Sequence, residues 1–176
     1  MNPLLWLAAR QLIRLRRGRN PPARLPDPIW YFAYGANMSE RLIRERRHLT
    51  PIETRIGVLA DHRLVFTVAG GMRPGISAPA NVVEAPGRNV HGVLYLLPLH
   101  QFARLDNSEG KQYDYLRTEV EDSAGQRVPV VTYRVLQPAA EGKPGRRYFD
   151  VIRAAARQRG LPADYLALLD HIDTRE

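Results

Sequence analysis

Short runs of apolar residues, several of them alternating with polar residues, recur along the chain at the length of β-strands. The two runs that flank Ser123–Ala124–Gly125 predict a β-hairpin, and Pro129 in the second run favours an edge position or a bulge. The runs that predict strands are residues 29–34, 55–59, 63–68, 77–84, 89–97, 115–122 and 126–135.

Helical segments separate these strands. Ser39 is expected to cap a polar helix, and Pro98 opens a helical segment that ends at Gly110. Two further helices are expected at residues 146–159 and 162–172. Strands with helices inserted among them predict an α+β fold whose mixed sheet is strongly curved.

Residues 1–28 have a different pattern and predict a basic amphipathic helix followed by a proline-rich linker, which leaves residues 29–176 as the domain. The apolar stretch is too short to span a bilayer, and the arginines follow it, the reverse of the order in a signal peptide. The helix either packs on the domain or on a second subunit of a homodimer, or it lies on an anionic membrane surface. One face holds Leu4, Leu5, Ala8, Leu12 and Leu15, and the opposite face holds Arg10, Arg14 and Arg17.

Composition and charge narrow the classes of function. The 176 residues are 44% hydrophobic and 25% charged, which is typical of a globular protein. The chain has no cysteine, which excludes disulfides and thiolate chemistry and fits a cytoplasmic protein. The net charge of +8 favours anionic partners. However, six arginines and no acidic residue lie in residues 1–25, so the other 20 basic and 18 acidic residues carry only +2.

Several kinds of catalytic site are absent from the sequence. It has no HExxH pattern, no GxSxG pattern and no phosphate-binding loop of the form GxxxxGK[ST]. The histidines are scattered, so a metal site built from them is not expected. They are His48, His62, His91, His100 and His171.

A predicted turn between a strand and a helix contains Tyr34, Gly35, Ala36 and Asn37. Glycine permits a sharp bend and lets a ligand approach the main chain closely. Several N–H groups would converge at the start of the following helix, where the dipole also favours negative charge. The turn therefore suits a carboxylate or a developing oxyanion, although a plain turn has the same local sequence.

Two acidic residues, Asp106 and Glu109, lie three positions apart at the end of a predicted helix, before Gly110. The negative end of the helix dipole disfavours their charged form, which is useful to a group that takes up and returns a proton. The alternative interpretation places both acids on a solvated helix face.

These features follow one another in an order that closely resembles the γ-glutamylcyclotransferase family. The usual opening of that family is YFAYGSN, and its acid lies in an L-D-x-x-E-G segment. The resemblance extends from residue 30 to the C-terminus. It rests on YFAYGAN at 31–37, VHGVLYLL at 90–97, LDNSEG at 105–110, a Y-x-R-x-x-V strand at 115–120, TYRV at 132–135 and RRYFDVIRAAARQRGLPADYLALL at 146–169.

The resemblance implies a small mixed β-barrel with flanking helices and a defined reaction. The α-amine of an N-γ-glutamyl amino acid or amine attacks its own γ-carbonyl, which leaves 5-oxoproline and a free amine. Both reacting groups belong to one small substrate, so the attack is intramolecular. No metal or other cofactor is implied.

The resemblance also implies roles for individual residues. Glu109 corresponds to the general acid/base of the family, and residues 34–37 correspond to the loop that binds the glutamyl end through main-chain N–H groups. Tyr133 matches a tyrosine of the family's site, and Tyr148 is a second candidate. Ala36 replaces the usual serine, which removes a hydroxyl group but keeps the backbone donor.

Other classes of function remain open at this stage. A non-catalytic binding scaffold of the same fold is one alternative, but the presence of Glu109 counts against it. A basic protein that binds nucleic acid or a membrane surface is another. No recognition motif accompanies the charge, so nucleic acid ranks below a small γ-glutamyl substrate as the expected partner.

Overall fold

The computed structural model describes residues 25–69, 77–110, 113–135 and 138–176. The amphipathic helix and most of the linker expected in residues 1–28 lie outside these residues. The described end of the linker packs on the domain. Leu25 is buried, and the Asp27 carboxylate accepts a hydrogen bond from the N–H of Leu99 at 3.0 Å.

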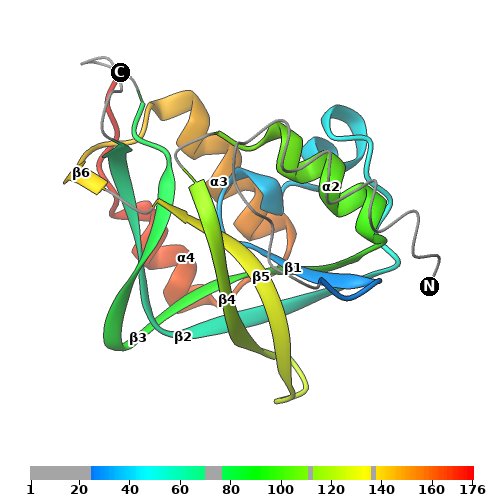
Figure 1. Cartoon of the computed structure of the whole chain (residues 1–176). Helices are drawn as coiled ribbons and strands as arrows, with labels where there is room; N and C mark the ends of the chain where they lie inside the picture. The colour runs from blue at the N-terminus through cyan, green and yellow to red at the C-terminus, as the bar shows by residue number, and fades with distance from the viewer. Residues whose placement is uncertain (1–24, 70–76, 111–112, 136–137) are drawn as a thin grey trace.

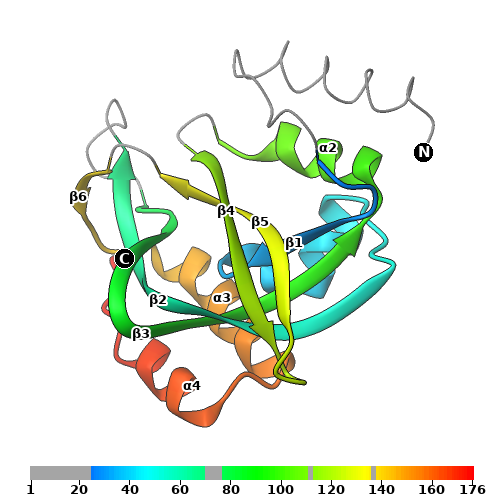
Figure 2. The same ribbon diagram turned by 60° about the horizontal axis from the view of Figure 1, so that its bottom comes forward.

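Five strands form a closed, mixed β-barrel (Figures 1 and 2). Their order is β3-β1-β5-β4-β2, and β2 pairs again with β3, which closes the barrel. β1 and β5 are parallel where Tyr31 faces Val131, whereas the other neighbours are antiparallel. This confirms the mixed barrel predicted from the sequence. The strands are β1 (Ile29–Ala33), β2 (Glu53–Ala69), β3 (Ala80–Leu97), β4 (Tyr113–Asp122) and β5 (Arg127–Val135), and a short β6 (Pro138–Glu141) pairs with the end of β2.

Two pairs of predicted strands are single long strands in the structure. The predicted breaks within residues 55–68 and 77–97 are bends inside β2 and β3. Asp61 has a φ of 54° and Gly87 a φ of 74°, and the pairing register shifts around Asp61. The N–H of Gly87 donates to the Asp61 carboxylate at 2.8 Å across this irregularity. Each strand therefore bends around the barrel without ending.

Pro129 pairs on one side only, which fits the expected edge position, whereas the expectation of a bulge is wrong. It faces Glu119 of β4 in an unbroken register. β5 also pairs with β1 at Val131, two residues further along. β1 thus joins β5 beyond the residue that lacks an N–H group.

Helical segments flank the barrel in the described part of the chain. The helix expected after Ser39 is reduced to one short turn, η2, and a separate 3-10 turn, η1, precedes Ser39. The hydroxyl of Ser39 accepts a hydrogen bond from the N–H of Leu42 at 3.3 Å and so caps the second turn. The segments are the 3-10 turn η1 (Ala36–Met38), the π-helical turn η2 (Leu42–Arg46), α2 (Leu99–Ser108), α3 (Arg146–Gln158) and α4 (Ala163–Asp170).

Aromatic rings join α2 to the barrel. Phe102 of α2 stacks on Tyr133 of β5 with ring centroids 6.3 Å apart, and Tyr31 of β1 is tilted against both rings. All three side chains are buried. Large rings contribute much of the apolar area that a core buries. These contacts hold α2, the helix that Glu109 follows, against the sheet.

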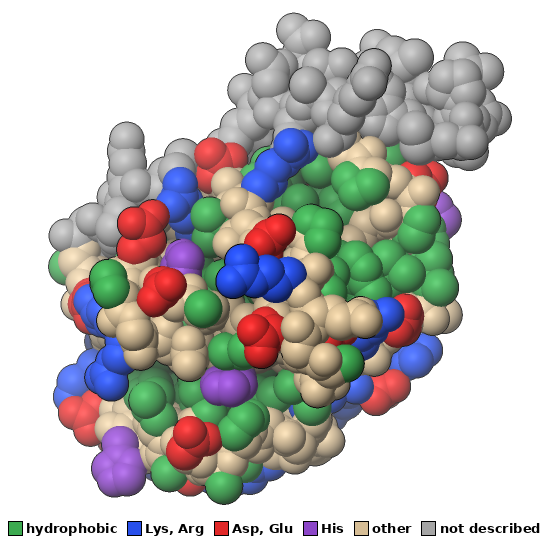
Figure 3. Space-filling view, turned by 90° about the horizontal axis from the view of Figure 1, so that it is seen from below, with side chains coloured by type: hydrophobic (Ala, Val, Ile, Leu, Met, Phe, Trp, Pro, Cys, Tyr) green, Lys and Arg blue, Asp and Glu red, His purple; other side chains and the backbone are tan. Residues whose placement is uncertain are grey.

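The surface charge of the described domain is mixed. Figure 3 shows basic and acidic side chains interspersed on one face, with no continuous basic patch there. Basic side chains of the described residues form ion pairs with nearby acidic ones, as in Arg157–Asp170 and Arg63–Glu141. The face in Figure 3 thus offers no broad surface for a polyanion.

Candidate active site

A cavity of about 250 Å³ opens where the turn after β1 meets the end of α2. Its wall also contains Tyr31, Arg47 and Tyr113, which sequence reasoning did not select. All residues predicted for the site line this one cavity: Tyr34, Gly35, Ala36, Asn37, Glu109, Tyr133 and Tyr148.

The turn after β1 supplies main-chain donors. The N–H groups of Met38 and Ser39 bond back to the carbonyl groups of Gly35 and Ala36, both at 3.0 Å. The N–H groups of residues 35–37 precede these bonds and meet no acceptor among the described residues. Because these residues line the cavity, their N–H groups are candidates to bind an anionic group of a ligand.

Glu109 is held beside this turn by a side chain of the turn itself. It is the C-cap residue of α2, and its side chain is 12% exposed. The Asn37 amide donates to Glu109 Oε1 at 2.8 Å and also lies 2.9 Å from the Tyr31 hydroxyl. The sequence indicated backbone donors at residue 37 but not this use of its side chain. Asn37 thus couples the predicted loop to the predicted acid.

The second acid of the segment has a different environment. Asp106 is completely buried, and the Tyr133 hydroxyl donates to its Oδ1 at 2.9 Å. The solvated helix face considered for both acids is therefore wrong for Asp106. Tyr133 lines the cavity with its ring while its hydroxyl bonds to Asp106.

Gly35 allows the turn to approach the facing wall. A Cβ atom at this position would lie 3.2 Å from the Cβ of Ala80 and 3.7 Å from the Tyr148 hydroxyl. The Tyr148 hydroxyl accepts a hydrogen bond from the N–H of Ala80 at 3.1 Å. A larger residue would crowd β3 and reduce the space beside Tyr148.

The cavity is lined by phenols that stay protonated. Burial raises the pKa of Tyr148 to about 12, and it raises the pKa of Tyr31 well above its ordinary value. The negative charge of Glu109 raises both further. The phenols can therefore serve as neutral hydrogen-bonding groups at physiological pH. Those whose pKa is raised are Tyr31, Tyr34, Tyr113, Tyr133 and Tyr148.

Arg47 places a positive charge next to Glu109. Its Nη2 lies 3.5 Å from Glu109 Oε1, and its Nη1 donates to the carbonyl of Ser108 at 3.2 Å. In the sequence it is one of several arginines in ERLIRERRH, which look alike. The π-helical turn before it, closed by a bond from the N–H of Arg47 to the carbonyl of Leu42, shifts the helical phase and could not be read from periodicity.

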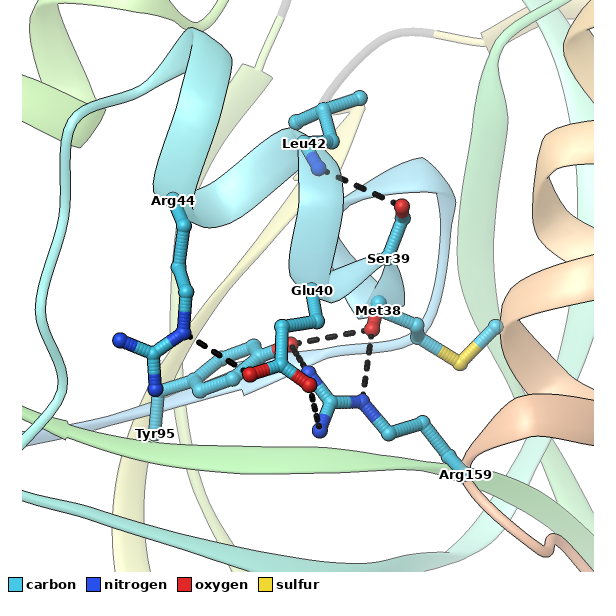
Figure 4. A network of polar contacts seen from close by, with 7 residues as sticks. All are labelled: Met38, Ser39, Glu40, Leu42, Arg44, Tyr95 and Arg159. Atoms are coloured by element: carbon cyan, nitrogen blue, oxygen red, sulfur yellow. Dashed lines mark hydrogen bonds and ion pairs between the residues drawn. The ribbon is translucent and has the colours of Figure 1, made fainter.

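A second network supports the turn from the side of α3 (Figure 4). Arg159, which follows α3, donates from Nε to the carbonyl of Met38 at 3.1 Å and from Nη2 to the Tyr95 hydroxyl at 3.0 Å. The Tyr95 hydroxyl donates to the same carbonyl at 3.0 Å, and Glu40 lies 3.4 Å from the guanidinium. These contacts fix the last residue of η1 and thereby the turn that lines the cavity.

The described residues contain no cluster of three or more histidine, aspartate or glutamate side chains that could hold a metal ion. None of the helices in this part of the chain is long and apolar enough to cross a membrane.

The described domain is a closed mixed barrel with the mostly buried carboxylate of Glu109 held beside the turn after β1. The sequence model of the AIG2-like family matches residues 89–169. The γ-glutamylcyclotransferase of Bos taurus is 27% identical over 85% of this chain and 81% of its own length. The γ-glutamyl cyclotransferase verK of Clonostachys rogersoniana is 29% identical over 70% of this chain and 83% of its own length.

Other relatives differ more in length or share only the fold. The γ-glutamyl cyclotransferase aclK of Aspergillus oryzae is 27% identical over 81% of this chain, and the chain spans 60% of its length. A solved γ-glutamyl cyclotransferase has a TM-score of 0.76 at 23% identity and covers 85% of this chain and 90% of its own. YkqA of Bacillus subtilis has a TM-score of 0.70 at 22% identity, over 94% of this chain and 60% of its own.

The chain is similar in sequence to the AIG2-like family and to curated γ-glutamylcyclotransferases, and these relatives support an enzyme of that type. The solved structures are 22–23% identical to this chain, and the comparison with them shows that the fold is the same.

Proposed function

We propose that this protein cyclises an N-γ-glutamyl amino acid or amine to 5-oxoproline and releases the free amine, with Glu109 as general acid and base. The observation that carries the proposal is the 2.8 Å hydrogen bond between the Asn37 amide and Glu109 Oε1 inside the cavity. It places the one acidic side chain of the described cavity wall next to the N–H groups of the turn.

The reaction transfers two protons and needs no water. Glu109 takes a proton from the α-ammonium group, and the free amine attacks the γ-carbonyl carbon to form the new C–N bond. The tetrahedral intermediate collapses as the bond to the leaving nitrogen breaks, and Glu109 returns the first proton to that nitrogen. The ring nitrogen then gives up its second proton through Glu109 to the released amine, which leaves as an ammonium ion. Because nucleophile and electrophile are in one molecule, the protein chiefly imposes the folded conformation of the substrate.

The turn is proposed to bind the glutamyl end. The N–H groups of residues 35–37 supply donors for its carboxylate or for the oxyanion that develops on the carbonyl oxygen. The Tyr34 hydroxyl donates to the carbonyl of Tyr133 at 2.5 Å, which ties the turn to β5. Donors that are fixed before the substrate arrives need little reorganisation during the reaction.

Two further residues complete the proposed substrate site. Tyr148 offers a protonated hydroxyl beside Gly35, and Tyr133 offers the face of its ring. Ala36 lacks the hydroxyl of the serine usual in the family. If that hydroxyl contacts substrate elsewhere in the family, this protein lacks one hydrogen bond of about 0.5–1.5 kcal/mol. Main-chain binding by the turn is unaffected by this change.

Mass spectrometry of a panel of γ-glutamyl amino acids and amines tests the proposal. The expected result is 5-oxoproline in equal amount to the released amine, without added metal. A binding scaffold would instead show ligand-dependent thermal stabilisation with no product from any compound. The proposal also includes a cytoplasmic location, which fits a small intracellular substrate and the absence of cysteine.

A further inference from the structure

The main-chain donors of the turn are neutral, so the one positively charged side chain of the described cavity wall is that of Arg47. Within the described cavity wall, the charged side chains are Glu109 and Arg47. The γ-glutamyl group has an α-ammonium and an α-carboxylate, and a leaving amino acid adds a second carboxylate. Glu109 can pair with the ammonium. A carboxylate in the same small cavity needs a cation or fixed donors to replace its water.

The position of Arg47 allows its guanidinium to supply that cation. It follows η2 directly, and its side chain is 24% exposed, so the guanidinium is partly shielded but reachable from the cavity. Its bond to the Ser108 carbonyl fixes the guanidinium next to Glu109. The two contacts engage only part of the five N–H donors of a guanidinium, whose planar fork matches a carboxylate.

We propose that Arg47 binds a carboxylate of the substrate and thereby makes this enzyme selective for γ-glutamyl compounds that carry it. The inference rests on the proposed function of the same site. The shared chemistry is a carboxylate within reach of Arg47, and it has two sources in a γ-glutamyl amino acid. One is the glutamyl α-carboxylate, and the other is the carboxylate of the leaving amino acid.

A simpler role for Arg47 makes a different prediction. If the guanidinium only forms an ion pair with Glu109 and does not contact the substrate, its removal changes the turnover of every substrate by the same factor. If it binds a substrate carboxylate, its removal penalises only compounds that have that carboxylate. The ratio between matched substrates therefore separates the two roles, and a loss of overall stability does not move that ratio.

The experiment measures kcat/KM for three compounds by the amine released. They are γ-glutamyl-alanine, γ-glutamyl-alaninamide, and the α-carboxamide analogue of γ-glutamyl-alanine. Each is assayed with the unmodified protein and with Arg47→Gln, which keeps a donor for the Ser108 carbonyl but removes the charge. Arg46→Gln is the matched control, because Arg46 is exposed at the end of η2.

With the unmodified protein and with Arg46→Gln, one of the two amides should be poorer than γ-glutamyl-alanine by roughly 10- to 100-fold, the value of a charge-assisted hydrogen bond. That amide identifies the carboxylate that is bound. In Arg47→Gln the penalty should shrink to within about threefold, and Arg47→Lys should restore part of it. Arg47→Lys also serves as the test if the glutamine variant does not fold, since a single point charge should weaken the discrimination.

Arg47→Gln with an undiminished penalty for both amides overturns the inference, as does an unmodified protein that does not discriminate. If the unmodified protein releases no 5-oxoproline from any γ-glutamyl compound, the proposed function itself has failed. The two failures are therefore distinguishable.

Discussion

The side-chain amide of Asn37 lies 2.8 Å from Oε1 of Glu109, although the two residues are 72 positions apart in the sequence. Asn37 belongs to the 3-10 turn after the first barrel strand, and Glu109 follows the helix that packs beside it. This contact joins the element proposed to bind the glutamyl end to the group proposed to move the protons. The two parts of the site are therefore positioned by one hydrogen bond.

Asn37→Ala removes that bond and should lower activity more than stability. A hydrogen bond to a charged group contributes about 1.5–3 kcal/mol, so kcat/KM should fall roughly 10- to 100-fold. Steady-state kinetics and circular dichroism together measure both effects. Asn89→Ala, at an exposed position of β3, is the control. Unchanged kcat/KM in a folded Asn37→Ala protein would contradict the positioning role.

Arg159→Met should weaken substrate binding from outside the cavity. Arg159 holds the carbonyl of Met38, the last residue of η1, and its loss should let the turn move. We expect KM to rise by roughly threefold to tenfold with kcat nearly unchanged, because the lost hydrogen bonds hold the turn without touching the substrate. Arg157→Met, which breaks an exposed ion pair with Asp170 on the same side of the molecule, is the control. Equal KM values for the two variants would refute this role.

The stability of the protein should fall at alkaline pH. Burial is the first cause of the raised pKa of Tyr31, Tyr34 and Tyr133, so these phenols stay neutral in the fold but ionise above about pH 10 once the chain unfolds. Their contribution is complete below the unfolded pKa and is lost as pH rises. The free energy of unfolding should decrease by about 1.4 kcal/mol per pH unit for each such phenol.

Urea unfolding between pH 8 and pH 11 checks this dependence. Tyr113→Phe removes another buried phenol whose pKa is raised by burial. In this variant the free energy of unfolding should therefore fall less steeply with pH above about pH 10, by the contribution of one proton. A free energy of unfolding that is constant across this range would show that the phenols ionise in the folded protein as they do in water.

Much of the fold could be predicted because apolar alternation marks barrel strands wherever they lie. The bends at Asp61 and Gly87 could not, since a turn residue that ends a strand and one that bends it have the same sequence. The residues predicted for the site were selected from the order of the motifs over the chain, and they line one cavity. Arg47 and the burial of Asp106 were missed, because both depend on packing between segments far apart in the sequence.

The role predicted for the N-terminal arm remains a prediction. Flotation with anionic liposomes should carry the full chain upward and leave residues 25–176 behind, and added salt should abolish the difference. Leu25 is retained in the shorter protein because it is buried in the domain. Equal behaviour of the two proteins would refute the membrane contact and leave packing on the domain or on a second subunit.

The most direct test of the proposed reaction is 5-oxoproline formation by the unmodified protein and by Glu109→Gln. The glutamine side chain has nearly the same shape and can still meet the Asn37 amide through its own oxygen, but it cannot take up and return the proton. We predict release of 5-oxoproline by the unmodified protein and a loss of at least about a hundredfold in Glu109→Gln, with the same thermal unfolding midpoint within a few degrees. A folded Glu109→Gln protein that forms 5-oxoproline at the unmodified rate would contradict the assignment.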